Sequence, residues 1–558
     1  MSVKGRKARL AVTAGLAAAL ALGSVVAPVA QAYADGGYTV TIESTSDYKV
    51  DGQYKVYRLF TGSFADTNTD NGKMGNAVAN DSYREDMRTV LNTFLADGNK
   101  VPAVDAAHSQ LVVDTAIADG IAGLPEARKQ EFANKLAAAL KDKAGSTSVN
   151  ADNGTLSVTG LEAGYYLIVN PDVENNAMTS AILVPVNHNR EVSIKTSTPT
   201  VIKQVKVSNE DYKKNTDVGL TSATTVEKLT YKLEGTVASN IADYDAYKYV
   251  FTDTLPTGVT VTNERVDGVT GDSTKPGWGV KVTAKVGETT RDITASFSLP
   301  SGLNGNEVTW TCGNLKQALL DAGFSSENLG KAKIALTYTP DYTVTELGAA
   351  LVGEGMPAVT NTAKLSYSNN PYIEGTGTVA DTTSAQSKVY TYKLSLSKVK
   401  KASEGEGTSP LDGAKFTLKR FNSETNAFDQ IVFENKEASD GSLAFTGLDS
   451  GVEYELSETT VPAGMKSIDP IKFKIVAVQN TDGTVTKVTA DKTSDPSNAA
   501  TFVNATDTDN VIDVTVTNIE GADLPTTGQQ GIVAGVAVGG IVLTVSLVAI
   551  SRNRKRSE

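Results

Sequence analysis

The sequence predicts a mainly β protein, in which tandem Ig-like β-sandwich domains follow an N-terminal α+β domain. The 558-residue length exceeds what one hydrophobic core supports and favours three or four domains. Thr- and Val-rich stretches alternate apolar and polar residues, with Gly, Asp and Ser turns at sandwich-like spacing. One apolar run near the C-terminus predicts a single transmembrane helix.

Composition excludes several function classes. The net charge of −12 argues against a nucleic acid partner and indicates a solvated outer surface. Cys312 is the single cysteine, so no intramolecular disulfide can form. The two histidines, His108 and His188, form no cluster typical of zinc or of a Ser-His-Asp triad. We therefore expect that the protein binds no metal and no cofactor and that it is not an enzyme.

The N-terminus has the pattern of an export signal. A basic region that includes Lys4 and Arg9 precedes an apolar run over residues 10–27. Small residues then allow cleavage after Ala32 or after Ala34. The sequence predicts a signal peptide over residues 1–34 and a secreted protein.

Residues 35–195 predict the α+β domain. Alternation over 38–42 and 54–60 indicates strands, and residues 164–169 predict a further strand after a tight turn. Ser82 and Glu85 have the spacing of a capping box, so we expect a helix to begin there. A second helix is expected over 125–143.

Two β-rich blocks follow, at 196–388 and 389–523. The first contains a strand at 229–233, and the second contains strands at 392–397 and 511–516. Each block opens with a strand that carries a lysine and ends near one that carries an asparagine.

Residues 524–558 combine three signals in a fixed order. An apolar run over 532–550, about 29 Å long as a helix, spans a bilayer core. A basic tail, whose last basic residue is Arg556, is expected to hold the C-terminus in the cytoplasm. Before them stands a five-residue motif, Leu524, Pro525, Thr526, Thr527 and Gly528.

This arrangement resembles the LPXTG sorting signal of sortase substrates in Gram-positive bacteria. The resemblance implies that a sortase cleaves between Thr527 and Gly528 and transfers the Thr527 acyl group to an amine. A transient membrane intermediate and anchoring to cell-wall peptidoglycan are then expected.

The block 389–523 resembles a collagen-adhesin B-type (CnaB-like) sandwich. The resemblance rests on the Lys398 strand, on Tyr454-Glu455-Leu456-Ser457-Glu458-Thr459, which fits the family's Y-x-L-x-E-T box, and on a final strand that ends in Asn518. By position, it implies an isopeptide bond between Lys398 and Asn518, with Glu458 as the buried acid. Burial frees the lysine lone pair and keeps the acid protonated, so the chemistry is physically sensible.

The block 196–388 resembles the D2-type domain of sortase-assembled pilins (CnaA-like). The carried-over residues are Lys203 on the first strand, Asn361 near the end and Asp253 as the acid. Four neighbouring residues remain alternatives for these roles: Lys206, Asn369, Asp243 and Glu234.

Lys195 lies where pilin backbones carry a V-x-V-Y-P-K motif, whose lysine accepts the next subunit. This sequence has Val192-Ser193-Ile194-Lys195, without the Tyr-Pro. The resemblance implies a backbone (major) pilin, the shaft subunit of a fimbrium that supports cell adhesion. Its implied partners are a pilin-specific sortase, a housekeeping sortase, peptidoglycan, minor pilins and other copies of the chain. The alternative is a monomeric LPXTG wall-anchored adhesin for a host or glycan ligand.

Overall fold

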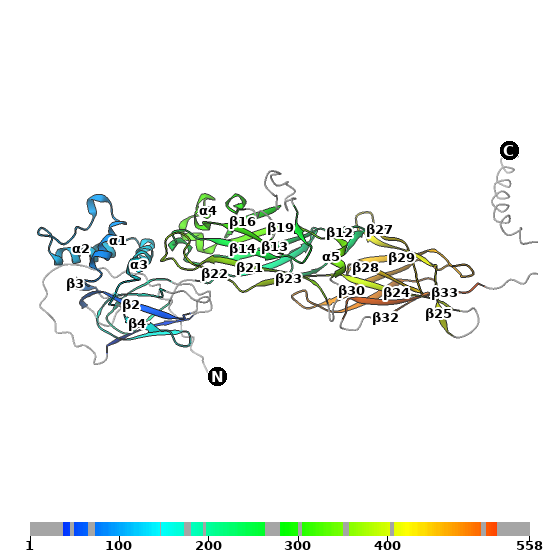
Figure 1. Cartoon of the computed structure of the whole chain (residues 1–558), viewed down its shortest axis with the longest axis horizontal. Helices are drawn as coiled ribbons and strands as arrows, with labels where there is room; N and C mark the ends of the chain where they lie inside the picture. Colours follow the sequence, from blue (N-terminus) through cyan, green and yellow to red (C-terminus); the bar gives the residue numbers. More distant parts are fainter. Residues whose placement is uncertain are drawn as a thin grey trace, which may run out of the picture.

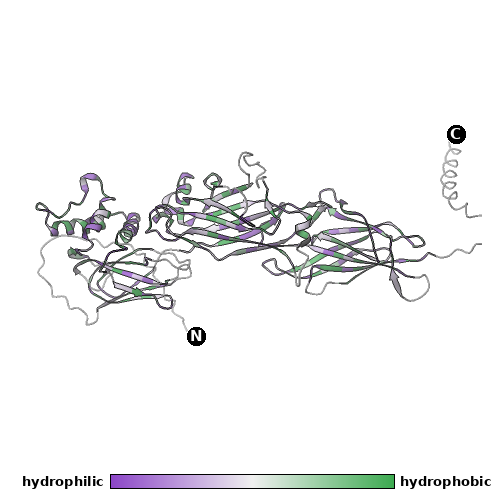
Figure 2. Cartoon of the chain, in the orientation of Figure 1, coloured by the Kyte–Doolittle hydropathy of each residue, from purple (hydrophilic) through white to green (hydrophobic). Residues whose placement is uncertain are grey.

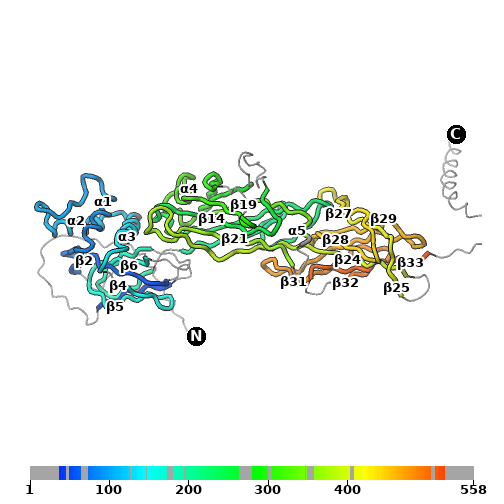
Figure 3. The backbone as a smooth tube through the Cα atoms, in the orientation of Figure 1, coloured from blue at the N-terminus to red at the C-terminus, as the bar shows by residue number. Residues whose placement is uncertain are grey.

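The chain forms three domains in a row, in sequence order along one axis (Figure 1). This computed structural model describes residues 37–44, 50–64, 73–145, 147–171, 180–193, 197–262, 279–298, 304–349, 357–401, 407–503 and 509–521. Lys195, the expected signal peptide and the expected sorting signal lie outside the described residues. No described helix combines the length and apolar character needed to cross a membrane. Figure 3 shows that the backbone completes each domain before it enters the next.

The N-terminal domain contains two β-sheets. The smaller sheet has the strand order β5 (Thr155–Leu161), β1 (Tyr38–Glu43) and β8 (Arg190–Val192). The larger sheet has the order β3 (Met74–Ala79), β2 (Gln53–Phe64), β6 (Gly164–Val169) and β7 (Ile182–Val186), with β4 (Thr147–Asn150) paired to β2. Side chains alternate along β6, so Tyr166 and Ile168 join the core between the sheets, whereas Tyr165 and Leu167 join a second core.

Helices cover the second core, next to the larger sheet. They are α1 (Arg84–Asn92), α2 (Gln110–Gly123) and α3 (Glu126–Leu140), with a short 3-10 helix η1 (Asp97–Asn99). The two expected helices are confirmed as α1 and α3, but α2 was not expected. The capping box was wrong, because α1 begins after Tyr83 and no side chain caps it. The Ser82 backbone N–H instead bonds to Asn80 Oδ1.

The middle domain is a sandwich of two mainly antiparallel sheets. One has the order β17 (Thr289–Asp292), β16 (Val280–Val286), β19 (Lys333–Tyr338), β13 (Leu229–Thr236) and β9 (Val201–Val207). The other has the order β10 (Asn215–Asp217), β23 (Ala385–Tyr390), β21 (Val359–Ser368), β14 (Tyr249–Thr254) and β18 (Glu307–Cys312), with β22 (Val379–Asp381) on β21.

Short elements close the ends of this sandwich. Two small ladders pair β11 (Leu220–Ser222) with β12 (Thr225–Val226), and β15 (Thr260–Val261) with β20 (Pro340–Asp341). The helices are η2 (Ile241–Asp243), η3 (Thr294–Ser296), α4 (Leu315–Asp321), η4 (Ser326–Lys331) and α5 (Val344–Ala349).

The C-terminal domain is a second sandwich, and only Thr391 separates its first strand from β23. One sheet has the order β25 (Thr408–Pro410), β24 (Tyr392–Lys401), β33 (Val511–Ile519) and β32 (Ala500–Val503), with β28 (Ser442–Leu448) also paired to β24. The other has the order β27 (Ala427–Glu437), β26 (Lys415–Asn422), β29 (Glu453–Thr460), β30 (Ile471–Gln479) and β31 (Val485–Ser494).

The expected fold class, mainly β with tandem sandwiches after an α+β domain, is confirmed. Hydrophobic and hydrophilic residues are interspersed along the strands in Figure 2, as expected where one face of each strand is buried. The expected strands at 229–233, 392–397 and 511–516 correspond to β13, β24 and β33.

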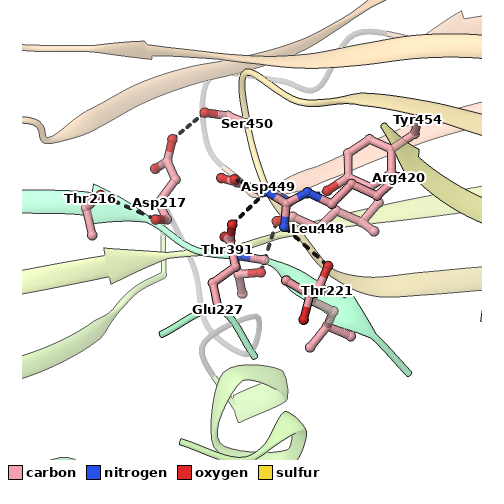
Figure 4. A network of polar contacts seen from close by, with 12 residues as sticks. Thr216, Asp217, Thr221, Glu227, Thr391, Arg420, Leu448, Asp449, Ser450 and Tyr454 are labelled. Carbon is pink, nitrogen blue, oxygen red and sulfur yellow. Dashed lines mark hydrogen bonds and ion pairs between the residues drawn. The ribbon is translucent and has the colours of Figure 1, made fainter. Parts of the chain in front are cut away.

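A polar network joins the middle and C-terminal domains (Figure 4). Arg420 of β26 donates to Glu227 of the middle domain at 2.6 Å and to Asp449 of its own domain at 3.3 Å. Asp217, at the end of β10, accepts hydrogen bonds from Tyr392 at 2.9 Å and from Ser450. Hydrogen bonds and an ion pair between side chains therefore connect the two domains at this interface.

The joint holds more negative than positive charge. Burial, with the nearby Glu227 charge as a smaller cause, raises the pKa of Asp449 well above its usual value. Burial also raises the pKa of Asp217. Arg420 is 8% exposed and offsets the remaining carboxylate charge. Arg420 is therefore the cation that pairs directly with both Glu227 and Asp449 at the joint.

We expect Arg420→Met to lower the free energy of unfolding by about 3 kcal/mol at pH 7.5, because buried carboxylates lose their cation. The loss should be smaller at pH 5. A carboxyl group whose pKa is raised in the folded state binds its proton more tightly there than in the unfolded chain. The variant therefore recovers part of its lost free energy of unfolding as pH falls. Urea unfolding at both pH values measures this.

Arg291→Met is the matched control, because Arg291 is exposed and donates a hydrogen bond to the carbonyl of its neighbour Thr290. Equal stability of the two variants at pH 7.5 would contradict the proposed importance of Arg420.

Candidate functional site

The first candidate site lies between the two sheets of the middle domain. Lys203 is the third residue of β9 and shares its inward face with Val205 and Val207, which are buried. Ile202, the residue directly before Lys203, faces the other side of the sheet and is 48% exposed. The period of two along a strand therefore carries the lysine side chain into the core.

The amine of Lys203 meets the carboxyl group of Asp253 in a fully buried position. Nζ lies 2.5 Å from Asp253 Oδ2, and both side chains are 0% exposed. Nζ also lies 4.7 Å from the ring centroid of Tyr231. Burial lowers the pKa of Lys203 and raises the pKa of Asp253, while their mutual attraction opposes both shifts. Burial removes the solvation of both charged groups, and it therefore favours a neutral amine beside a neutral carboxylic acid.

Asn361 completes this group from the neighbouring strand β21. Asp253 pairs with Ala363 in the ladder, so Asn361 lies two residues along on the same face. Its Nδ2 donates to the Tyr338 hydroxyl at 2.8 Å, and that hydroxyl donates to Asp253 Oδ2 at 2.8 Å. Oδ1 of Asn361 and Oδ1 of Asp253 are buried without a hydrogen-bond partner among the described residues. Unpaired buried polar atoms are costly.

The four alternative residues lie elsewhere. Lys206 and Glu234 are on the outer face of their sheet, where Lys206 lies 5.2 Å from the Tyr212 ring and Glu234 lies near Lys333. Asn369 follows β21, and its Oδ1 accepts from the Thr378 hydroxyl.

Asp243 ends η2, at the end of the domain that faces α3. Burial raises the pKa of Asp243 to about 7. Asp253, by contrast with these four residues, accepts a hydrogen bond from Lys203 Nζ.

The second candidate site lies in the C-terminal domain. Lys398 of β24 is fully buried, and its Nζ donates to the carbonyls of Val399 at 3.1 Å and Val516 at 3.2 Å. Burial lowers the pKa of Lys398 to about 8, although the nearby Glu458 charge opposes the shift. A larger fraction of this amine is therefore neutral, and so nucleophilic, near neutral pH than in an exposed lysine.

Asn518 lies on the parallel neighbour β33, two residues beyond the partner of Lys398. Its Nδ2 donates to both carboxyl oxygens of Glu458, at 3.1 Å and 2.9 Å, and to the Lys466 carbonyl at 3.1 Å. Burial raises the pKa of Glu458, and the Asn518 hydrogen bond and Lys398 lower it less. Oδ1 of Asn518 is buried without a partner among the described residues.

The structure therefore brings each set of three expected residues to one place in its own sandwich. Sequence reasoning missed Tyr338 and Tyr231, which surround the Lys203 amine. Their only sequence signal is a tyrosine on the inward face of a strand, a pattern that ordinary core tyrosines share.

The C-terminal domain matches a known domain family. Residues 395–494 match the family described as SpaA: Prealbumin-like fold domain. No curated protein sequence matches the chain significantly.

Solved structures of Gram-positive major pilins share similarity with nearly the whole chain. The T6 backbone pilin of Streptococcus pyogenes serotype M6 is 15% identical with a TM-score of 0.46, and the alignment covers 88% of this chain and 99% of that one. SpaD of Corynebacterium diphtheriae is 15% identical with a TM-score of 0.42, over 87% and 98% of the two chains. BcpA of Bacillus cereus is 14% identical with a TM-score of 0.34, over 87% and 99%.

Proposed function

We propose that this chain is the shaft subunit of a covalent cell-surface pilus, stiffened by one intramolecular isopeptide bond in each sandwich. The observation that carries the proposal is a buried lysine placed with an acid and an asparagine in two successive domains. A buried lysine without chemistry would cost several kcal/mol in each domain. Two such costs in one chain indicate that the lysines react.

The reaction is the same at each site. The neutral lysine Nζ attacks Cγ of the asparagine, the Cγ–Nδ2 bond breaks, and ammonia leaves with a proton that the lysine gave up. The acid, Asp253 or Glu458, stabilises the charge that develops on the amide. Folding holds the partners together, which replaces a bimolecular encounter. Each site reacts once on its own chain, so the protein is a structural subunit and not an enzyme.

The expected sorting signal and Lys195 supply the links between subunits. A pilin sortase would join Thr527 of one copy to Lys195 of the next, and a housekeeping sortase would attach the last copy to peptidoglycan. Tension would then enter at Lys195, pass through both sandwiches and leave at Thr527. This path loads the two domains that carry the candidate bonds.

The mass of the mature subunit tests the internal bonds. Residues 35–527 should weigh less than their sequence by two ammonia molecules, and Lys203→Met or Lys398→Met should each restore one. Intact-mass spectrometry measures this, and Lys206→Met is the control that should keep both bonds. A wild-type mass equal to the uncorrected sequence would refute the isopeptide proposal.

The shaft proposal predicts a ladder of high-mass species in wall extracts boiled in SDS. Lys195→Ala should collapse the ladder to monomer, because the acceptor amine is lost. Lys213→Ala, which removes another lysine exposed on the middle domain, should leave the ladder unchanged. A single monomeric band in wild type would instead favour the wall-anchored adhesin.

The pKa shifts predict how the rate of C-terminal bond formation depends on pH. If the reactive form combines a neutral Lys398 amine with a protonated Glu458 carboxyl group, the two side chains together carry one titratable proton. The rate should then be flat just below pH 8 and fall about tenfold per unit above it, as that proton leaves. Chains purified in denaturant and diluted into buffers of different pH, then quenched and weighed, give this profile.

The measurement uses a Lys203→Met background, so that one bond forms. Glu458→Gln should abolish the alkaline fall. A wild-type rate that keeps rising above pH 8 would show that ionised Glu458 is the active form, contrary to the proposal.

A further inference from the structure

We propose that Tyr338 is a catalytic residue of the middle-domain reaction, relaying a proton from Asp253 to the departing nitrogen of Asn361. This inference rests on the proposed function, because it assigns a step in the formation of the Lys203–Asn361 bond. It concerns the middle domain alone. The C-terminal site has a different arrangement of its acid and amide.

The hydroxyl of Tyr338 links the acid to the amide through two hydrogen bonds. It donates to Asp253 Oδ2 at 2.8 Å and accepts from Asn361 Nδ2 at 2.8 Å. No direct hydrogen bond between Asp253 and Asn361 is found among the described residues. Among the described residues, hydrogen bonds therefore connect Asp253 to the leaving nitrogen through this phenol.

The aromatic ring holds the hydroxyl in place. Tyr338 is fully buried at the end of β19, next to β13 and β16. Its ring stacks on Tyr231, with centroids 5.5 Å apart, and lies against Trp310 at 5.4 Å. These packed rings restrict the torsions that would carry the hydroxyl away from its two partners.

The phenol is suited to pass a proton without keeping a charge. Burial raises the pKa of Tyr338 well above its usual value, so the hydroxyl remains protonated. It can give its proton to nitrogen only if Asp253 returns one at the same time. This concerted exchange avoids a buried phenolate, which would lack solvation.

The step balances as follows. Neutral Lys203 Nζ bonds to Cγ of Asn361 and passes one of its protons to Asp253, while the neutral Asp253 carboxylic acid gives a proton to Tyr338. Tyr338 gives its own proton to Nδ2, and the Cγ–Nδ2 bond breaks. One ammonia leaves, one amide remains, and both Asp253 and Tyr338 end in their starting protonation states.

The C-terminal site provides an internal comparison. There Asn518 Nδ2 donates directly to both oxygens of Glu458, so the acid contacts the leaving nitrogen without an intermediate. A relay is needed where the acid and the nitrogen are separated by a hydroxyl, and it is not needed where they touch. Loss of the Tyr338 hydroxyl should therefore slow one bond and spare the other.

The experiment follows both bonds in the same molecules. Mature subunit, residues 35–527, is purified in denaturant, diluted to fold, quenched at intervals and digested, so that the two cross-linked peptides are counted separately. Tyr338→Phe should slow the Lys203–Asn361 bond about 100-fold, the usual scale for a proton-transfer group. The Lys398–Asn518 bond should form at the wild-type rate.

Tyr249→Phe is the matched control, because buried Tyr249 donates its hydroxyl to the Thr236 carbonyl in the same sandwich and touches none of the reacting groups. If Tyr338→Phe forms the middle bond as fast as Tyr249→Phe, the relay is refuted while the proposed function stands. If wild type forms neither bond, the proposed function itself fails.

A second variant covers the case in which Tyr338→Phe does not fold. Tyr338→3-fluorotyrosine keeps the hydroxyl and its size but makes the phenol more acidic. A changed rate of the middle bond, with an unchanged C-terminal bond, supports proton transfer through the hydroxyl. Identical rates for tyrosine and fluorotyrosine would overturn the relay.

Discussion

The burial of a lysine amine near an acid and an asparagine is the constraint that the two sandwiches share, and in the middle domain the amine contacts the acid directly. In the middle domain the Lys203 and Asp253 side chains are completely inaccessible, and aromatic rings occupy the space where water would solvate them. In such surroundings the charged pair is disfavoured, and the neutral amine and neutral acid are the reactive forms. The feature that would destabilise an ordinary core is therefore the one that would prepare the proposed chemistry.

The reaction would remove this cost. Once the amide has formed, the lysine carries no charge, and the Asn361 side chain, whose Oδ1 has no partner among the described residues, has become part of the cross-link. Each bond would also close a long loop of roughly 160 or 120 residues. The chain-entropy treatment of cross-links assigns such loops about 5 kcal/mol each. A chain with a single, buried cysteine would gain from this chemistry what other extracellular proteins gain from disulfides.

Much of the fold could be predicted from the sequence, because strands with one buried face alternate visibly. Helix α2 could not, since Leu111, Val112 and Val113 have a composition equally typical of a strand. The candidate residues of the two isopeptide sites were located through motif position, which is local information. Tyr338 was not, because its role depends on Asp253, 85 residues away along the chain. The Arg420–Glu227 contact spans 193 residues and has no local signal at all.

The position of the bonds in the topology explains why two sandwiches of different connectivity would share one chemistry. In the C-terminal domain, β24 and β33 are parallel neighbours, and they are the first and last strands of that domain. Tension applied to the two chain ends would therefore shear this one ladder, and a covalent bond from Lys398 to Asn518 would carry the force instead of its hydrogen bonds. In the middle domain, Lys203 is likewise on the first long strand. A bond across the core to Asn361 would let force pass from β9 to β21 without unfolding the strands between them.

Beyond β21 the force would continue through β23 into the joint at Arg420, where hydrogen bonds and ion pairs connect the two domains. Along this path, the interdomain joint would be the element that yields first and recovers when the tension is released.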